Sequence, residues 1–249
     1  MHKLQSMKLI KLDAIDSTND FLKGLVNKQY LENFTIVSAE SQTKGKGQMG
    51  SVWVSEKGKN LTMSVFVKDS LTVLNQIYSL NIAVALAIVQ ALETFEIPQL
   101  SIKWPNDIMS YNYKIGGILI ENSIKNDGSI SSVIGIGLNI NQITFDNLPK
   151  GSSLAVVVCN RQFDKHQILL KIVNRLKDNV VLLNKEPDLL WKTYLKVLFK
   201  KGVPMPFKDN SNKNFMGIIQ GVSEFGKLQL LLEDDTTAEY NIKEIQMLY

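Results

Sequence analysis

The residues best suited to chemistry form a short polar run around a proline, followed by a lysine and two glycines. The run is Lys103-Trp-Pro-Asn-Asp107, and the later segment is Lys114-Ile-Gly-Gly117. Proline fixes its own φ and removes a backbone donor, so the chain should turn at Pro105. Two lysines and a carboxylate beside glycines, which permit close backbone approach, predict a site for an anionic ligand. A solvated β-hairpin with Tyr111-Asn112 at its tip is the alternative that these residues leave open.

A glycine-rich loop lies upstream of this run. Gly45-Lys-Gly-Gln-Met-Gly50 has the G-x-G-x-x-G spacing, but a dinucleotide-binding fingerprint should open a helix on a parallel sheet. Here Ser51-Val-Trp-Val54 continues as an extended, alternating chain. Backbone amides freed by glycine can form an anion-binding nest, to which Lys46 adds charge. We therefore predict an anion-binding loop between two strands, with a merely flexible connection as the open alternative.

Together these segments resemble the biotin protein ligases, which adenylate biotin and transfer it to a carboxylase lysine. The resemblance runs from about Leu9 to the C-terminus, and its motifs occur in the family's order. Any one motif is weak evidence, but the series is strong. The motifs are Ser17-Thr-Asn19, Gln42, the glycine loop with Trp53, Lys103–Asp107, the strand from Lys114, and Gly135-Ile-Gly-Leu-Asn139.

The resemblance implies an α+β fold in two parts. A catalytic domain like that of class II aminoacyl-tRNA synthetases, with a mixed sheet and helices, would occupy residues 1–200. A small C-terminal SH3-like β-barrel would occupy residues 201–249. It also implies biotin and ATP as ligands, with Mg²⁺ near the triphosphate, although we assign no protein ligand to the metal.

Acyl-adenylate formation brings a carboxylate against the α-phosphate of ATP, so a site must neutralise both anions and hold them in line. The only arginines, Arg161 and Arg175, lie outside the motifs, so lysines must do this work. By resemblance, Lys114 pairs with the biotin carboxylate, while Lys103 and Lys46 contact phosphate oxygens. The glycine loop would close over the ligand and exclude water, which would hydrolyse a mixed anhydride.

The resemblance also implies roles for the remaining motif residues. Ser17, Thr18 and Gln42 would bind the polar ureido ring of biotin. Trp53 would form a wall of the pocket, although a core tryptophan is as good an interpretation. Asp107 would orient or deprotonate the incoming lysine amine. The full predicted binding set is Ser17, Thr18, Asn19, Gln42, Gly45, Lys46, Gly47, Trp53, Asn106, Gly116, Gly117 and Asn139, and the catalytic set is Lys114, Lys103, Asp107 and Gln48.

The glycine loop departs from the family pattern, which usually carries arginines. The corresponding positions hold Lys46, Gln48, Met49 and Ser51. Gln48 replaces the arginine that would face the carboxylate and α-phosphate, and it is neutral. We hypothesise that Lys46, together with the adjacent Lys44, compensates for the lost charge.

Composition bounds the location and the partners. The net charge of +4 suits ATP and an acidic carrier domain of a biotin-dependent carboxylase, but it is too weak to argue for nucleic-acid binding. No secretory signal is apparent, and the apolar stretch Leu80 to Leu92 is too short to span a bilayer. The single cysteine, Cys159, provides no disulfide framework, which fits a cytoplasmic protein.

Hydrophobic periodicity predicts alternating helices and strands. The few residues before the first catalytic strand cannot hold a three-helix DNA-binding domain, so we expect no specific DNA binding; a homodimer stays possible. Helices are expected over 18–27, 73–95, 165–183 and 187–199. Strands are expected over 34–39, 61–67, 101–104, 115–121, 131–138, 216–221, 227–232 and 237–242.

Three other functions stay open. Lipoate ligases and octanoyl transferases share the catalytic fold, but the transferases use a cysteine nucleophile, and Cys159 follows the apolar run Leu154–Val158 as if in a buried strand. A non-catalytic binding module would not need the upstream motifs. A dinucleotide oxidoreductase is supported by the glycine spacing alone.

Overall fold

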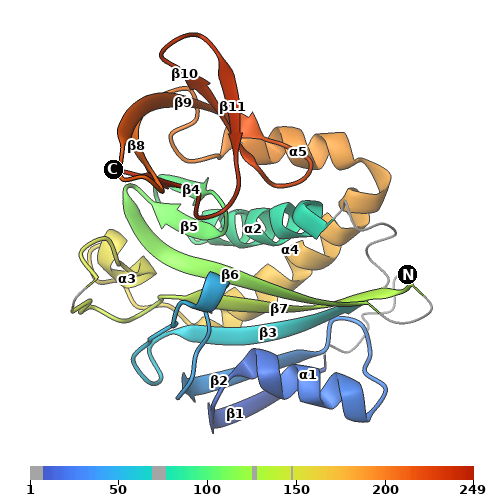
Figure 1. Ribbon diagram of the computed structural model, residues 1–249. Coiled ribbons are helices and arrows are strands. Elements are labelled where there is room, and N and C mark those ends of the chain that lie inside the picture. Colours follow the sequence, from blue (N-terminus) through green and yellow to red (C-terminus); the bar gives the residue numbers. More distant parts are fainter. Residues whose placement is uncertain (1–7, 69–76, 125–127, 147) are drawn as a thin grey trace.

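The computed structural model describes residues 8–68, 77–124, 128–146 and 148–249, which form two sheets with helices around the larger one (Figure 1). The larger sheet has seven strands in the order β1-β2-β3-β7-β6-β5-β4. Only β1 and β2 are parallel; every other neighbouring pair is antiparallel. The strands are β1 (Leu9–Ile15), β2 (Ile36–Gln42), β3 (Leu61–Lys68), β4 (Leu100–Lys103), β5 (Asp107–Ser110), β6 (Tyr113–Ile124) and β7 (Ile130–Leu138).

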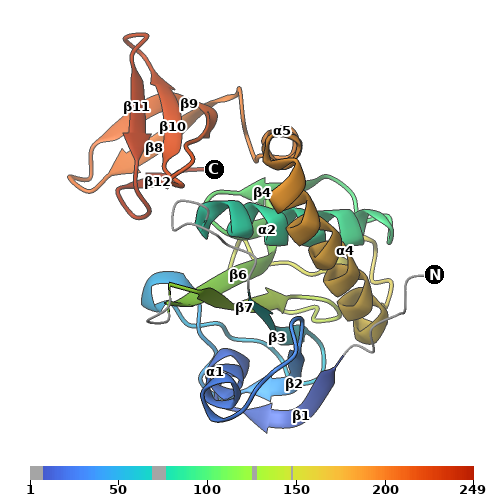
Figure 2. The same ribbon diagram turned by 90° about the vertical axis from the view of Figure 1, so that its right-hand side faces the viewer.

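Both faces of this sheet are covered, because apolar residues alternate along its central strands. On β3, Val65 and Val67 belong to one buried cluster, whereas Phe66 between them belongs to another. The first cluster lies under α2 (Ile77–Glu93) and α4 (Lys165–Lys185), and the second under α1 (Thr18–Lys28). Figure 2 shows α1 on the opposite side of the sheet from α2 and α4. The predicted mixed sheet with helices is therefore confirmed.

Capping side chains and a proline mark where the helices begin. Ser17 caps α1, and Asp164 caps α4 through the amides of His166 and Gln167. Pro187 begins α5 (Pro187–Lys196), the position where its missing N–H is harmless. Helix α2 is buried along nearly its whole length, as the apolar stretch predicts. Residues 73–76 of the predicted helix lie outside the described residues. No helix in the described segments is long and apolar enough to cross a membrane.

A second, five-stranded antiparallel sheet follows α5, in the order β11-β10-β9-β8-β12. Its strands are β8 (Pro204–Asp209), β9 (Asn214–Val222), β10 (Leu228–Leu232), β11 (Thr237–Tyr240) and β12 (Ile245–Met247). The β9–β10 turn docks on the first sheet, where the indole Nε1–H of Trp104 donates to the carbonyl of Gly226 at 2.9 Å. The two sheets therefore meet at the Lys103–Asp107 segment.

Two details differ from or refine the sequence predictions. Cys159 is exposed and has a φ of 57°, so the expectation of a buried strand cysteine is wrong. The apolar run before it forms α3 (Leu154–Val157), because Ser153 caps it by accepting from the amide of Val156. The hairpin of β5 and β6 does turn at Tyr111-Asn112, so the hairpin and the anion site are compatible features of one segment.

Candidate active site

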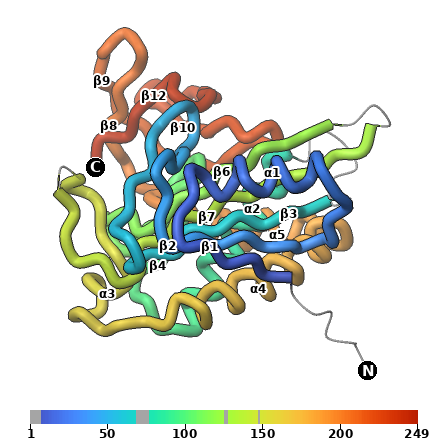
Figure 3. The backbone as a smooth tube through the Cα atoms, turned by 90° about the horizontal axis from the view of Figure 1, so that it is seen from below, coloured from blue at the N-terminus to red at the C-terminus, as the bar shows by residue number. Residues whose placement is uncertain are grey.

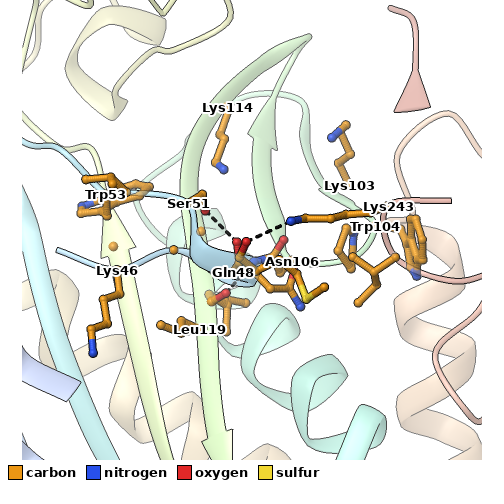
Figure 4. Close-up of a pocket in the computed structure, with 18 of the residues that line it drawn as sticks. Lys46, Gln48, Ser51, Trp53, Lys103, Trp104, Asn106, Lys114, Leu119 and Lys243 are labelled. Carbon is orange, nitrogen blue, oxygen red and sulfur yellow. Dashed lines mark hydrogen bonds between the residues drawn. The ribbon is translucent and has the colours of Figure 1, made fainter. Parts of the chain in front are cut away.

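A pocket of about 810 Å³ opens between the larger sheet and the C-terminal sheet. Its size is typical of small-molecule sites. Figure 4 shows Lys46, Lys103, Lys114 and Lys243 around the pocket, each from a different part of the chain. Twelve of the predicted site residues line it: Ser17, Thr18, Asn19, Gln42, Lys46, Gly47, Gln48, Trp53, Lys103, Asn106, Lys114 and Gly117.

The central charged group is an aspartate between two lysines. The Oδ1 of Asp107 lies 2.5 Å from the Nζ of Lys114, and its Oδ2 lies 3.2 Å from the Nζ of Lys103. The short β4–β5 hairpin pairs Lys103 with Asp107, and a register shift between Ile108 and Met109 brings in the β6 lysine. The Asp107 side chain is 14% exposed and the Lys114 side chain 39%. The Asp107 carboxylate therefore fixes the ammonium groups of Lys103 and Lys114 at the pocket.

The position of Lys114 is fixed from a distant segment. Its backbone N–H donates to the carbonyl of Lys150 at 2.7 Å, and its carbonyl accepts from the amide of Ser152 at 2.9 Å. Asn139 holds the same segment, because its side-chain amide donates to the Ser152 carbonyl at 2.9 Å. Asn139 is buried and does not line the pocket. Its observed contacts position the lysine strand.

A polar network forms the opposite end of the pocket. The amide and hydroxyl of Thr18 both donate to the Oε1 of Gln42, at 2.7 and 3.0 Å. Ser64, which we did not predict, donates to Thr18 at 2.8 Å and contacts the Oδ1 of Asn19 at 2.5 Å. The Nδ2 of Asn19 donates in turn to Glu121 at 2.8 Å. This network fixes the Gln42 side chain, whose Oε1 accepts both Thr18 hydrogen bonds.

Glycines form the floor beneath the indole of Trp53. A Cβ at Gly137 would overlap the Trp53 ring, and a Cβ at Gly135 would lie 2.6 Å from the Oδ1 of Asn19. A Cβ at Gly117 would meet Trp53 and Lys114 at ordinary contact distances of 3.6–3.7 Å. The sequence showed the alternating glycines of β7 as part of a motif. It did not show that they form a floor, because that role depends on the Trp53 ring lying across them.

Trp53 is half-buried and lines the pocket, which supports the wall interpretation over that of a core tryptophan. Its Nε1 is the one buried side-chain polar atom, among the described residues, without a hydrogen-bond partner. Buried polar groups are nearly always satisfied. An unsatisfied donor beside a pocket is therefore a feature that a ligand or water would complete.

The glycine loop joins β2 to β3 and contains a single 3₁₀ turn, Gln48–Gly50. Figure 3 shows it projecting from the sheet beside β12. Gly45 permits two chain segments to meet, because its carbonyl accepts from the Trp53 amide at 2.9 Å and a Cβ there would overlap the Trp53 carbonyl. A Cβ at Gly47 would likewise overlap the Ser51 hydroxyl. These two glycines therefore shape the loop.

The loop lysines are held by acidic residues of the N-terminal region. Lys46 lies 2.6 Å from Asp20, and Lys44 lies 2.8 Å from Asp16. The hydrogen bond from Lys46 holds the pKa of the Asp20 carboxyl below its usual range. That from Lys44 does the same to the pKa of Asp16. In this structure the two lysines neutralise carboxylates, so they do not add net charge to the pocket as we hypothesised.

Three other predicted residues do not line the pocket. Asp107 forms ion pairs with Lys103 and Lys114, which do line it, and Gly45 shapes the loop. Gly116 permits close strand packing, because a Cβ there would lie 2.9 Å from the Gly137 carbonyl. Asn106, which does line it, donates to the Ile118 carbonyl at 2.6 Å and ties the proline turn to β6.

The C-terminal sheet supplies lining residues that sequence reasoning missed. Lys243 lines the pocket and donates to the Met49 carbonyl at 3.0 Å. Tyr249 lies with its ring 5.5 Å from the Nζ of Lys103 and 3.7 Å from that of Lys150. Burial, and then the charge of Asp107, raise the pKa of the Tyr249 phenol. No motif marks these positions.

No group of three or more metal-ligating side chains occurs among the residues that the structure describes. Mg²⁺ commonly binds through one or two carboxylates plus substrate phosphates. Asp107 lies beside Lys103 and Lys114 at the pocket, so the donor set fits a metal that arrives with a triphosphate and does not fit an all-protein cage.

Comparisons with known proteins agree on one family. The sequence profile of the biotin/lipoate A/B protein ligase family matches residues 12–141. The bifunctional ligase/repressor BirA of Bacillus spizizenii is 30% identical over 247 residues, which cover 96% of this chain and 74% of that protein. The biotin–[acetyl-CoA-carboxylase] ligase of Paracoccus denitrificans is 33% identical over 131 residues, covering 52% of this chain and 53% of its own length.

A solved structure extends the similarity to the whole fold. The biotin protein ligase of Aquifex aeolicus, in complex with biotin and ATP, superposes with a TM-score of 0.78 at 25% identity. The match covers 97% of this chain and 98% of that one. The similarity therefore includes both sheets.

Proposed function

We propose, from the premise that this chain belongs to the biotin/lipoate A/B protein ligase family, that it is an ATP-dependent biotin–protein ligase. It activates biotin to biotinyl-5′-AMP and transfers biotin to a lysine of the carrier domain of a biotin-dependent carboxylase. The observation that carries this proposal is the Lys103–Asp107–Lys114 cluster at one end of a pocket whose other end is a fixed polar network.

The first step needs charge neutralisation. A biotin carboxylate oxygen forms a bond to the α-phosphorus of ATP, and the bond to the β-phosphate oxygen breaks, releasing pyrophosphate. The Lys114 ammonium stabilises the carboxylate and the new acyl phosphate, while Lys103 stabilises phosphate oxygens. Mg²⁺, when bound with ATP, would neutralise further phosphate charge. The glycine loop excludes water from the mixed anhydride.

The second step transfers the acyl group. The acceptor lysine amine forms a bond to the acyl carbon, the bond to the phosphate oxygen breaks, and AMP leaves. We assign to Asp107 the orientation or deprotonation of that amine, because the hairpin and two ion pairs fix its carboxylate beside Lys103 and Lys114, the lysines proposed to hold the adenylate. The Lys114–Asp107 ion pair would then break as the Lys114 ammonium moves to the negative charge of the ligand.

The polar end of the pocket favours biotin over lipoate or octanoate. Ser17, Thr18 and Gln42 line the pocket with polar groups that match a ureido ring, whereas an alkyl chain or a dithiolane would offer these groups no hydrogen-bond partner. An octanoyl transferase would need a cysteine nucleophile. The only cysteine, Cys159, is exposed and does not line the pocket. A lipoate ligase is the remaining second candidate.

ATP–pyrophosphate exchange with biotin, lipoate and octanoate supplied separately tests the proposal. We expect exchange with biotin alone. Exchange with lipoate or octanoate would assign the chain to the sister activity, and no exchange with any acid would overturn the adenylation step itself.

Several finer assignments rest on the sequence and are part of this proposal. We place the catalytic unit in residues 1–200 and an SH3-like barrel in residues 201–249; the observed antiparallel sheet supports the second assignment. Cytoplasmic location, a homodimer and the lack of specific DNA binding are likewise proposed. Sedimentation and gel shift measure the last two.

A further inference from the structure

The glycine loop of this chain brings little free positive charge to the pocket. Gln48, Met49 and Ser51 are neutral, and Lys46 is paired with Asp20 at 2.6 Å. A loop that must close over an anionic ligand is better held by a cation. The structure shows one approaching from the C-terminal sheet.

Lys243 reaches the loop from the turn before β12. Its Nζ donates to the Met49 carbonyl at 3.0 Å, and the side chain also lines the pocket. Figure 4 shows the ammonium group extended toward the loop on the side of Lys103. No carboxylate in the described ranges forms an ion pair with Lys243, so its charge is not neutralised by a neighbour as that of Lys46 is.

Both partners of this contact adopt unusual backbone conformations. The φ of Met49 is 54° and that of Lys243 is 72°, in the left-handed region that residues other than glycine rarely adopt. The turn that holds Lys243 is fixed by Glu244, which accepts from the backbone amide and the side-chain amide of Asn241. Local strain that surrounding structure maintains is commonest at functional sites.

The C-terminal sheet is anchored firmly enough to act as a support. The Trp104 indole donates to Gly226, and a Cβ on Gly226 would lie only 2.5 Å from the Tyr78 ring. This docking connects the sheet to the turn between Lys103 and Asp107. The same sheet therefore contacts both the proline turn and the glycine loop.

We propose that Lys243 is a positioning residue that latches the glycine loop over the pocket. Its ammonium group supplies there the positive charge that the neutral loop positions lack. The proposal deepens the function proposed above, and so rests on it, by naming the contact that retains the anionic acyl-adenylate. The latch joins two segments far apart in the sequence, so it exists only when the two sheets are docked.

The test compares Lys243→Met with Lys243→Arg and with Lys213→Met. Methionine keeps most of the length of the side chain but removes its charge and its donor, whereas arginine keeps the charge and a donor. Lys213 is an exposed lysine in the turn between β8 and β9 that does not line the pocket. The first readout is hydrogen exchange of the amides of residues 44–60 in the ligand-free protein, which does not depend on catalysis.

Lys243 is exposed, so its contact should contribute no more than an ordinary hydrogen bond, which corresponds to roughly a 2- to 12-fold change in an equilibrium. We expect Lys243→Met to speed exchange in the loop by that factor, Lys243→Arg to restore protection, and Lys213→Met to change nothing. Unchanged loop exchange in Lys243→Met would overturn the latch. Equal acceleration in Lys213→Met would overturn it too, since the effect would then be general.

The second readout is functional. In single-turnover reactions, Lys243→Met should release the acyl-adenylate about 2- to 12-fold faster and raise the KM for ATP, with kcat at saturation little changed. A fall in kcat alone would overturn the positioning role. If the unaltered protein shows no ATP–pyrophosphate exchange, the proposed ligase function fails. The hydrogen-exchange data on residues 44–60 would still show whether Lys243 latches the loop.

Discussion

The Nζ of Lys114 lies 2.5 Å from the Oδ1 of Asp107, and this ion pair fixes the side chain of the pocket's central lysine. The two residues come from adjacent strands of one hairpin whose register shifts between them. An anionic ligand that reaches Lys114 must compete with Asp107. The two side chains are therefore coupled, and substitutions should separate their roles.

Replacing Lys114 with methionine removes the donor proposed for the biotin carboxylate. A hydrogen bond to a charged group contributes about 1.5–3 kcal/mol, equivalent to a roughly 10- to 150-fold change in Kd. We expect the lower part of that range because the side chain is 39% exposed. Isothermal titration with biotin measures it, and the exposed Lys59→Met is the control. Unaltered affinity in Lys114→Met would show that the carboxylate binds elsewhere.

Asp107→Asn should separate the two half-reactions. The amide cannot accept a proton from an acceptor amine, so transfer to the carrier domain should slow by about 10- to 150-fold if the charged contact contributes roughly 1.5–3 kcal/mol. Pyrophosphate exchange should fall much less, since both lysines remain. Single-turnover transfer from preformed adenylate is the measurement, with the exposed Asp178→Asn on α4 as control. Equal losses in both steps would contradict the assignment.

Gly137→Ala should disturb the pocket wall, because the new Cβ would overlap the Trp53 ring. We expect weaker ligand binding and altered tryptophan fluorescence. Gly24→Ala is the control, since nothing lies within 4 Å of its Cβ and it sits in α1. That change should leave binding intact and stabilise the fold by about 0.5–1 kcal/mol. Binding by Gly137→Ala equal to wild type would show that the indole can move freely.

Gly226→Ala should loosen the docking of the two sheets. The φ of 84° strains any side chain, and the Cβ would also overlap the Tyr78 ring. Gly202→Ala is the matched control, because its φ is 75° but nothing lies within 4 Å. Each change should lower the unfolding free energy by about 1 kcal/mol from backbone strain. Gly226→Ala should lose more and should lower activity as well; similar losses in both variants would argue against a tight contact.

The Lys46–Asp20 ion pair should make stability depend on acid. The hydrogen bond from Lys46 lowers the pKa of Asp20 in the folded protein, so the contribution is complete above the unfolded value of about 3.9. It is lost as the pH falls through the lowered folded-state value. The stability difference between wild type and Asp20→Asn, measured by urea unfolding, should therefore shrink below about pH 4. A stability difference that stays the same across this pH range would contradict the ion pair.

Much of the site could be predicted because the chemistry of its residues is local. The sequence predicts an anion-binding site from two features alone. These are the proline turn that carries Lys103 and Asp107, and the glycine pair after Lys114. The sequence also predicted that the glycine loop is not a dinucleotide-binding site. Its glycines have the right spacing, but an extended segment follows them where such a site requires a helix. The structure brings these segments together at one pocket.

Other features depended on contacts that spacing does not encode. Lys44 and Lys46 were expected to bind the ligand, but they form ion pairs with Asp16, which follows β1, and Asp20, which lies in the first turn of α1. Cys159 follows an apolar run that reads as a strand, yet a serine cap makes that run a short helix.

The sequence by itself determined the site's chemical inventory and the alternation of helices and strands, because residue type, turn chemistry and periodicity act over a few positions. Only the tertiary structure decided which charges are free. Lys243 enters the pocket from a sheet that no local signal connects to the glycine loop, and Gly137 becomes a floor only because Trp53 crosses it. Ion pairing and close packing depend on distance in space, which the docking of the two sheets sets.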